Sequence, residues 1–199
     1  MSYTARDPYG AALGAVRRIA DSGRFSPGEP IVVTDLTGEV GLSPTPVREA
    51  LACLSGQGLV DRRPRRGYFF PALSGGEIID LFELELAYLH AALTLYPRGL
   101  APLRKAVVAI DPADGPAALF QAVIGSSGNA ALSWAHRRLT DRLKAVLRLE
   151  RTRNEADAVH VREMIKAIVD GRIPALLHLL EEHHERRCAR IGGAWLPGS

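Results

Sequence analysis

The sequence predicts a mainly α-helical protein with two domains, and three observations support this prediction. Of the 199 residues, 47% are hydrophobic and only 6% are aromatic, and the abundant alanine and leucine favour helices. Residues 1–73 combine helical with β-prone segments, whereas residues 77–199 contain six helical segments and are predicted to form an all-α six-helix bundle. Residues 74–76, Ser-Gly-Gly, lie between the two patterns and are expected to act as a hinge.

The first domain begins with two predicted helices. Apolar residues fall on one face of "AALGAVRRIADSG", and Gly23 is expected to end that helix. These apolar residues are Leu13, Val16, Ile19 and Ala20. Residues 27–30 contain two prolines and a glycine, which predict a turn followed by a short extended segment. In the second helix, "TDLTGEVGL", we expect Thr34 at the N-cap and Gly41 at the end.

The third predicted helix runs from about residue 43 to residue 56 and begins with "SPTP". Ser43 can cap the free amides of its first turn, and Pro44 and Pro46 occupy positions where an amide has no acceptor within the helix. The prolines therefore define the start of the helix and do not break it. Residues spaced i, i+4, i+7 face the core, and they are Val47, Leu51 and Leu54. Ser43, Thr45 and Arg48 are left at the exposed N-terminal end.

A β-hairpin is predicted after the third helix. Two β-prone runs, residues 59–60 and 68–70, flank the basic turn "RRPRRG". Four arginines lie within five residues at this turn, namely Arg62, Arg63, Arg65 and Arg66. Only Asp61 opposes their charge. Two helices, a turn, a third helix and a hairpin in this order predict a winged helix-turn-helix over residues 1–73.

The predicted third helix and hairpin together suggest a DNA-binding surface. In a helix-turn-helix, the N-terminal end of the recognition helix enters the major groove. Arg48 has the forked geometry that binds guanine or a phosphate, and the hydroxyls of Ser43 and Thr45 suit phosphate oxygens. The basic turn can reach the backbone or the minor groove, and Gly67 permits a close approach. A generic capped helix and a solvated charge run would explain each feature separately, but their occurrence together favours DNA binding.

The segment "VVTDLTGEVGLSPTPVREALACLSGQGLVDRRPRRGYFFPALSGGEIIDLFELE" resembles the DNA-binding domain of the GntR family of bacterial transcription regulators. The similarity covers roughly residues 10–85 and is greatest to the branch with the all-helical FCD effector domain. It rests on Leu36, Gly41-Leu42-Ser43, Thr45 to Leu51, Gly58-Leu59-Val60 and Arg66 to Phe69. The resemblance implies a homodimer that binds a short pseudo-palindromic operator in double-stranded DNA, usually as a repressor. Residues 77–199 would bind the releasing metabolite and form the dimer.

Two positions depart from the family pattern. Pro44 stands where the family often has arginine, and Thr34 stands where a basic residue is common near the start of the second helix. Two frequent operator contacts are therefore missing, and Arg48 and the basic turn must contribute more. The predicted DNA-contacting residues are Thr34, Ser43, Thr45, Arg48, Arg65, Arg66 and Gly67.

The resemblance also implies a divalent metal, which FCD domains commonly hold with one aspartate and three histidines. The family's Ser-Gly-Asn signature is present at residues 127–129. Two alignments of the preceding helix are open. One places Ala117 and Gln121 at the aspartate and histidine positions, and the other places Pro116 and Phe120 there. Neither alignment supplies a ligand.

The last two histidine positions of the family are only partly preserved. His183 matches the final one, whereas the other falls at Val161, with His160 beside it. We therefore expect that the metal site is lost and that no cofactor binds, with His160 and His183 as weak candidate ligands. Gln121, His160 and His183 are expected to line an effector pocket. Glu85 stands where the family often has arginine, which disfavours a simple carboxylate effector.

The other histidines are expected to be structural. At least one residue of His183-His184 is interpreted as part of a polar helix face. The remaining three, His90, His136 and His178, are interpreted as surface or boundary residues.

A ligand-responsive regulator is not the only function compatible with this sequence. A metal-dependent sensor and a ligand-independent regulator with a degenerate pocket stay open. No HExxH, nucleophile elbow, P-loop or dinucleotide motif occurs, so an enzyme is not expected. The net charge of +3 is too small to establish a polyanionic partner by itself. Without an apolar leader or membrane-spanning run, we expect no membrane association and a cytoplasmic protein, located at the nucleoid when bound to DNA. Cys53 and Cys188 are then expected to be reduced thiols.

Overall fold

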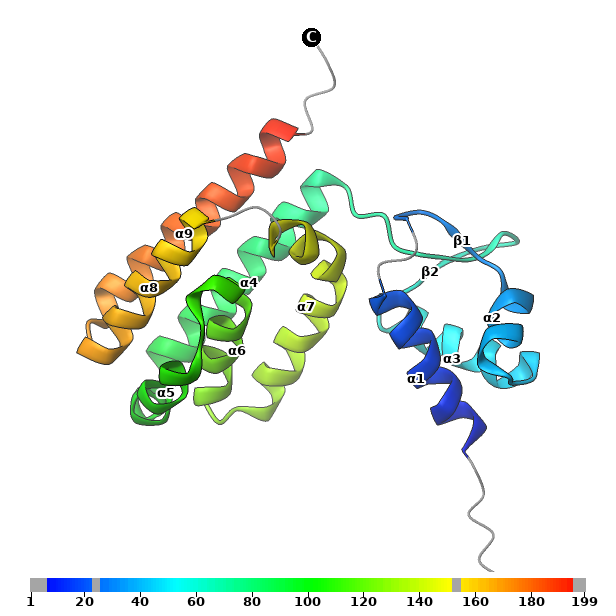
Figure 1. Cartoon of the computed structure of the whole chain (residues 1–199), viewed down its shortest axis with the longest axis horizontal. Helices are drawn as coiled ribbons and strands as arrows, with labels where there is room; N and C mark the ends of the chain where they lie inside the picture. Colours follow the sequence, from blue (N-terminus) through cyan, green and yellow to red (C-terminus); the bar gives the residue numbers. More distant parts are fainter. Residues whose placement is uncertain (1–6, 23–25, 152–154, 195–199) are drawn as a thin grey trace, which may run out of the picture. The chain divides into compact units, whose positions relative to one another are not determined.

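The computed structural model divides into two compact units, Met1–Leu73 and Ser74–Ser199. It describes residues 7–22, 26–151 and 155–194 (Figure 1). Each unit has its own cluster of buried apolar side chains. Within the described ranges, no helix is both long and apolar enough to span a membrane.

In its described residues, the first unit has three helices and a small sheet. Its elements are α1 (Pro8–Asp21), β1 (Pro30–Ile31), α2 (Val33–Val40), α3 (Pro44–Gly56), β2 (Asp61–Arg63) and β3 (Gly67–Phe69). The antiparallel sheet has the order β1-β3-β2, so β3 is the central strand. Its Tyr68 pairs with Ile31 of β1 on one side and with Arg62 of β2 on the other. Helices followed by a hairpin form the predicted winged helix-turn-helix.

The core of the first unit lies where α1 and α2 pack against α3. The predicted stripe of α3 is confirmed, because Val47, Leu51 and Leu54 are at most 1% exposed. The apolar face of α1 is also confirmed at Val16 and Ile19, which are buried. Leu13, which belongs to the same prediction, packs against the core. The side chain of Ala20 lies outside the described residues, and so does Gly23, the predicted end of the helix.

The start of α2 differs from the prediction. Val32 is the N-cap and Thr34 lies inside the first turn, so the assignment of Thr34 as the cap was wrong. Because Ile31 is held in β1, the chain passes directly from strand to helix and the helix begins before the threonine. Its end is as predicted, since Gly41 adopts φ +66° at the C-cap, a conformation that glycine adopts without steric cost.

The hairpin also begins later than its β-prone residues suggest. Residues 59–60 are not in a strand, and β2 starts at Asp61. The amide of Leu59 donates to the carbonyl of Leu54 and closes the end of α3, while Val60 is buried in the core. Both apolar side chains therefore complete the helical core, and the strand falls on the basic residues that follow.

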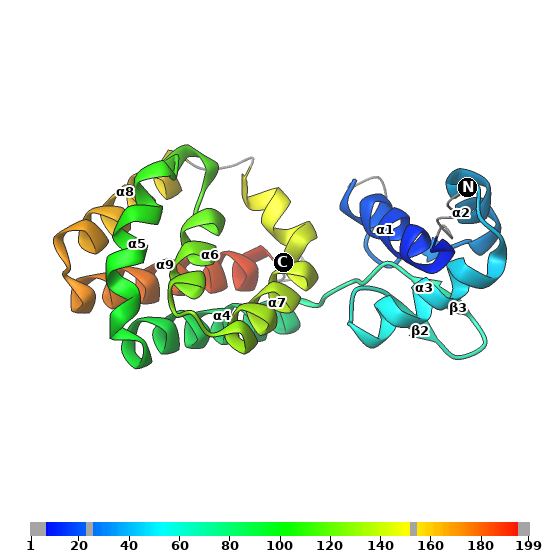
Figure 2. The same cartoon turned by 90° about the horizontal axis from the view of Figure 1, so that it is seen from below.

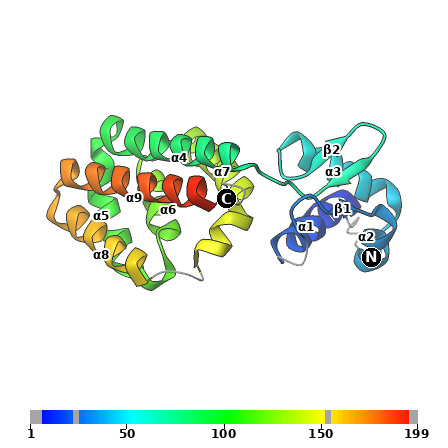
Figure 3. The same cartoon turned by 90° about the horizontal axis from the view of Figure 1, so that it is seen from above.

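The second unit contains six α-helices within the described ranges, as predicted. They are α4 (Gly75–Leu95), α5 (Leu100–Ala106), α6 (Ala117–Ser126), α7 (Ala130–Arg151), α8 (Glu155–Asp170) and α9 (Ile173–Ala194), with 3₁₀ turns at Pro97–Gly99, Val107–Ala109 and Pro112–Asp114. Helix α4 packs on α6, α7 and α9. It runs alongside α9 in the views from below and from above (Figure 2, Figure 3). The core of the bundle therefore lies around this central helix.

Residues 74–76, which the sequence predicts as a hinge, form the start of α4. Ser74 is the N-cap of a capping box: its hydroxyl accepts from the amide of Glu77, and the carboxylate of Glu77 accepts from the amide of Ser74. The amide and the hydroxyl of Ser74 both donate to the Glu77 carboxylate, and these two hydrogen bonds lower the pKa of Glu77 below its usual value. The two glycines are helical residues of the first turn.

Candidate DNA-binding surface and ligand cavity

The start of α3 has an unusual cap. Ser43 is extended (φ −69°, ψ 160°) and stands at the N-cap, but its side chain makes no capping hydrogen bond, contrary to the prediction. An N-cap hydroxyl accepts from the amide of the second or third helical residue. The third residue here is Pro46, which has no amide hydrogen, and Pro44 occupies the first position. The prolines thus remove donors that would need a cap and leave the hydroxyl of Ser43 uncommitted to the helix.

The N-terminal end of α3 is exposed along one side. Ser43, Thr45 and Arg48 all reach solvent, whereas Val47 is completely buried one position away from Arg48. Thr34 on α2 is exposed as well. The buried stripe therefore fixes the helix to the core and orients the predicted contact residues toward solvent.

The hairpin tip is a tight turn built from arginines. The amide of Arg66 donates to the carbonyl of Arg63 at 3.0 Å, with Pro64 and Arg65 between them. Arg65 has φ +62°, and it is the non-glycine residue with positive φ in the described chain. Proline followed by a positive-φ residue is typical of a type II turn, in which glycine or asparagine usually takes the second place. An arginine held there costs about 1 kcal/mol, which suggests a functional constraint.

The four arginines of the hairpin are all exposed, but they are not equivalent. The guanidinium carbon of Arg63 lies 4.2 Å from the centroid of the Phe69 ring, a cation–π contact that holds it against β3. Arg65 and Arg66 lie in the turn itself, followed by Gly67 at φ +92°. The three predicted DNA contacts of the hairpin, Arg65, Arg66 and Gly67, therefore lie at its tip, where side chains can extend away from the sheet.

A buried polar cluster lies inside the second unit, around Glu85 of α4. Arg187 of α9 donates from Nη1 to Oε2 of Glu85 at 2.8 Å, and both side chains are at most 2% exposed. His136 Nε2 of α7 lies 3.3 Å from the other carboxylate oxygen, Oε1. His184 Nε2 of α9 lies 3.6 Å from Oε2. The Arg187 guanidinium also packs over the ring of Phe82, 3.7 Å from its centroid.

This cluster keeps the Glu85 carboxyl ionised. Burial raises its pKa, but His136, His184 and Arg187 outweigh burial and lower the pKa well below its usual value. The interpretation of His136 as a surface or boundary residue was wrong, since it is 5% exposed and faces Glu85. The interpretation of a polar face at His183-His184 was also wrong, because both are at most 2% exposed.

Sequence reasoning missed Arg187 and the connection of Glu85 to it. The available signal was Glu85 itself, an acidic residue within the apolar run of α4. A buried carboxylate requires a partner, but the partner is 102 positions away in sequence. Only the packing of α4 on α9 reveals it.

A cavity of about 430 Å³ adjoins this cluster. Its polar wall is formed by Glu85, His136 and Arg187, and Gln121 and Arg137 also line it. Its apolar wall includes Phe120, Ile124 and Leu147. The volume falls in the range typical of small-molecule sites.

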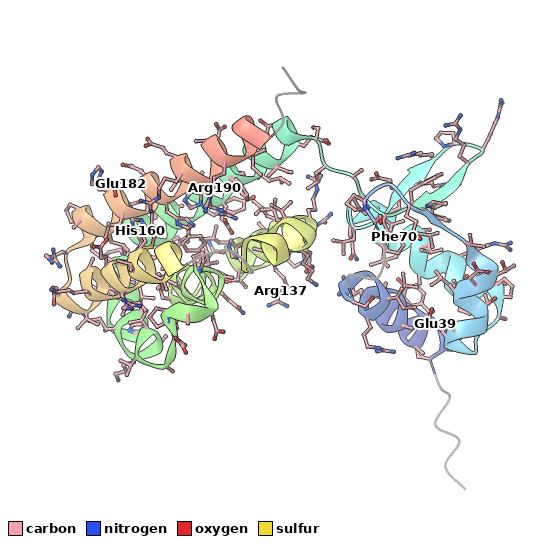
Figure 4. All side chains as sticks on the ribbon, turned by 45° about the horizontal axis from the view of Figure 1, so that its top comes forward. Glu39, Phe70, Arg137, His160, Glu182 and Arg190 are labelled. Carbon is pink, nitrogen blue, oxygen red and sulfur yellow. The ribbon has the colours of Figure 1, made fainter. Side chains whose placement is uncertain are left out.

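Of the three predicted pocket residues, one lines the cavity and two do not. Gln121 lines the cavity, whereas His160 and His183 are not among its lining residues. Phe120 lines it, and its ring packs edge-on against His183 with centroids 5.6 Å apart. His160 stacks on His183 at 5.8 Å. Figure 4 shows His160 on α8 and Arg137 on α7 at separate places in the second unit. Phe120 thus contacts both the cavity and His183.

The histidine group does not fit a divalent metal. Phe120 packs against His183 and His184, so an apolar ring that cannot donate to a metal lies beside both imidazoles. His160 Nε2 lies 2.8 Å from the carbonyl of Leu179, so this nitrogen donates and is not a metal ligand. In the part of the chain that the structure describes, no group of three or more His, Cys, Asp or Glu side chains could hold a metal ion.

His183 is the most isolated polar side chain of this histidine group. It is 1% exposed, and neither ring nitrogen has a hydrogen-bond partner among the described residues. Burial and the positive charge of Arg187 lower its pKa well below the usual value of histidine. His183 is therefore neutral in the folded protein at neutral pH.

Comparison with known proteins agrees with the geometry of the first unit. Residues 8–70 match the gntR family of bacterial regulatory proteins. The first unit is therefore similar to the helix-turn-helix domain of this family. Over 100 residues, the chain is 34% identical to an uncharacterized HTH-type transcriptional regulator of Agrobacterium vitis, covering 50% of this chain and 58% of the relative. Over 77 residues, it is 34% identical to the Nta operon transcriptional regulator of Aminobacter aminovorans, covering 39% and 37% respectively. The chain thus spans 58% of the length of the first relative and 37% of the length of the second.

Similarity of fold extends over both units. A GntR regulator structure from Rhodococcus sp. RHA1 superposes with a TM-score of 0.75 and 20% identity, covering 94% of this chain and 98% of that one. E. coli McbR/YncC superposes with a TM-score of 0.66 and 20% identity, covering 95% and 99%. At this identity the comparisons show the GntR-like architecture, and the chemistry of the cavity must be argued from its own residues.

Proposed function

We propose that this GntR-type protein is a transcription regulator that binds a specific DNA sequence through α3 and the hairpin tip, and whose DNA affinity changes when a small molecule binds in the cavity of the second unit. The observation that carries the proposal is the exposure of Arg65 and Arg66, with Arg48 at the solvent-facing side of α3, in a domain of the GntR family. The fully buried stripe beneath Arg48 supports this role, because it gives the recognition helix a fixed orientation.

The two parts of the surface would contact DNA differently. Arg48 near the N-terminus of α3 would reach a base edge or phosphate in the major groove, and Ser43 and Thr45 would donate to phosphates. Arg65 and Arg66 at the hairpin tip would contact the backbone or the minor groove. With Pro44 in place of a frequent arginine, a larger share of the affinity would come from the tip.

We further propose that the protein acts as a homodimer on a pseudo-palindromic operator, as a repressor, in the bacterial cytoplasm. A two-fold dimer presents two recognition helices to two half-sites, which accounts for operator symmetry. The all-helical second unit would provide both the dimer contacts and the effector site, as the FCD branch implies.

Fluorescence anisotropy with a labelled duplex from upstream of the protein's own gene tests DNA recognition. We expect binding that weakens steeply as salt rises, and at least about tenfold tighter binding than to a shuffled duplex. Equal affinity for both duplexes would contradict sequence-specific binding. Nuclease footprinting of the bound duplex should reveal two related half-sites.

We also propose that the regulator works without a divalent metal. This proposal is supported by the packing of Phe120 against His183 and by the commitment of His160 to the Leu179 carbonyl. Protein purified without chelators should contain far less than one transition metal per chain. About one metal per chain, lost in His183→Ala, would instead support the alternative of a metal-dependent sensor.

A further inference from the structure

The polar wall of the cavity carries charges of both signs at close range, which restricts the ligand. We propose that the cavity selects an uncharged small molecule whose polar head both donates and accepts hydrogen bonds, such as an alcohol, over a carboxylate or an amine of the same size. This inference rests on the proposed effector site and adds the chemical class of its ligand.

Charged ligand heads are disfavoured by fixed charges of the wall. A carboxylate placed at Glu85 would meet a like charge that is 2% exposed and poorly screened by water. An ammonium group at the same place would meet the like charge of Arg187, which is 1% exposed. Arg137 also lines the cavity but is exposed, so water screens its charge toward ligands of either sign. Because Glu85 and Arg187 already neutralise each other at 2.8 Å, this buried pair has little net charge with which to attract an ion.

The wall also offers uncharged polar side chains. Gln121, Ser133 and Thr140 line the cavity, and Gln121 is exposed. An amide side chain presents one group that donates hydrogen bonds and one that accepts them. A hydroxyl can accept from the amide nitrogen of Gln121 or donate to its oxygen, and it brings no charge close to Glu85 or Arg187.

The rest of the cavity favours a ligand whose remaining part is apolar. Phe120, Ile124 and Leu147 form the apolar side, with Phe120 and Ile124 themselves at most 2% exposed. A cavity of about 430 Å³ accommodates a ring compound of about ten non-hydrogen atoms. Its burial against these side chains would supply most of the affinity, and the head group would supply the selectivity.

Three probes on one skeleton test this inference: 2-phenylethanol, phenylacetate and 2-phenylethylamine. Their dissociation constants for the full chain without DNA can be measured at pH 7.5 by ligand-observed NMR. We expect the alcohol to bind at least about tenfold more tightly than either charged probe. Because DNA is absent, this result and the DNA-binding result fail independently.

Two matched glycine variants locate the binding site. Gly125 of α6 lines the cavity, and a Cβ atom built there meets nothing within 4 Å, so Gly125→Leu should extend its side chain into cavity space. Gly192 of α9 is equally open but does not line the cavity, which makes Gly192→Leu the control. We expect alcohol binding to be lost in the first variant and retained in the second.

A charge variant tests the selectivity itself. In Glu85→Gln, phenylacetate should gain affinity relative to 2-phenylethanol, with circular dichroism confirming that the variant is folded. The inference is overturned if a charged probe binds the wild type as tightly as the alcohol, if the alcohol does not bind, or if it binds Gly125→Leu unchanged.

Discussion

The two units of the protein use charged side chains in opposite ways. In the first unit, Arg48, Arg65 and Arg66 face solvent on a rigid helix and turn. In the second, Glu85 and Arg187 are at most 2% exposed and joined at 2.8 Å. Exposed arginines contribute little to folding and stay available to a polyanion, whereas a buried charge must be paired, because losing its partner destabilises the fold. Substitutions in the first unit should therefore change binding, and those in the second should change stability.

The largest expected effect comes from breaking the buried pair. Arg187→Leu leaves the Glu85 carboxylate buried without its main partner and should lower the free energy of unfolding by about 3–5 kcal/mol. Glu85→Leu combined with Arg187→Leu removes both charges and should cost much less. Urea unfolding followed by circular dichroism measures both variants. Equal losses in the single and double variants would show that the unpaired Glu85 carboxylate is not what destabilises Arg187→Leu.

The exposed arginines should affect binding alone. Arg48→Ala with Arg66→Ala should weaken DNA binding by about 100-fold, because each end of the surface then has one arginine fewer to bind a base or a phosphate. Urea unfolding should be unchanged. The control, Arg98→Ala with Arg162→Ala, removes two exposed arginines of the second unit and should retain wild-type affinity. Comparable weakening in the control would indicate a general charge effect.

A smaller effect concerns the pH dependence of stability. The pKa of His183 is lowered in the folded protein, so below about pH 6.5 the unfolded chain binds a proton that the folded chain does not. Stability should therefore fall as pH decreases through this range, by up to about 1.4 kcal/mol per pH unit from this residue. Urea unfolding between pH 7.5 and 5.5 should show a shallower dependence in His183→Leu. His178→Leu, at an exposed position, should keep the wild-type dependence.

The smallest expected effect is at the hairpin tip, where one residue combines both behaviours. Arg65→Asn places a residue that tolerates positive φ in the turn and should raise the stability of the first unit by up to about 1 kcal/mol. DNA affinity should fall a few-fold at the same time. Arg62→Asn, in β2, should not stabilise the unit. A loss of stability in Arg65→Asn would mean that the arginine is not under conformational constraint.

How much the sequence predicts also differs between the units. In the first, local signals suffice: the spacing of Val47, Leu51 and Leu54 predicts the buried stripe, and Gly41 predicts the helix end. The errors in this unit are local. Leu59-Val60 is β-prone and predicts the first strand of the hairpin, but it completes the helical core and the strand begins at Asp61. In the second unit, helices are predicted by periodicity, but the pairing of Glu85 with Arg187 depends on which helices pack together.

The histidines illustrate the same limit. "EEHHERR" predicts a polar face by composition, yet His183 and His184 turn inward against Phe120. Whether a histidine faces solvent or the interior of a bundle depends on the rotation of its helix against its neighbours. That rotation is set by tertiary packing and has no short sequence signature.

The DNA-binding role is tested most directly by the salt dependence of affinity for the upstream duplex. It is measured on the full wild-type chain and on the double variant Arg48→Ala with Arg66→Ala. The wild-type association constant should fall linearly with salt on a logarithmic scale. The slope of Arg48→Ala with Arg66→Ala should be shallower by about one for each phosphate that the variant no longer neutralises. An unchanged slope and affinity in the double variant would contradict the assignment of this surface to DNA.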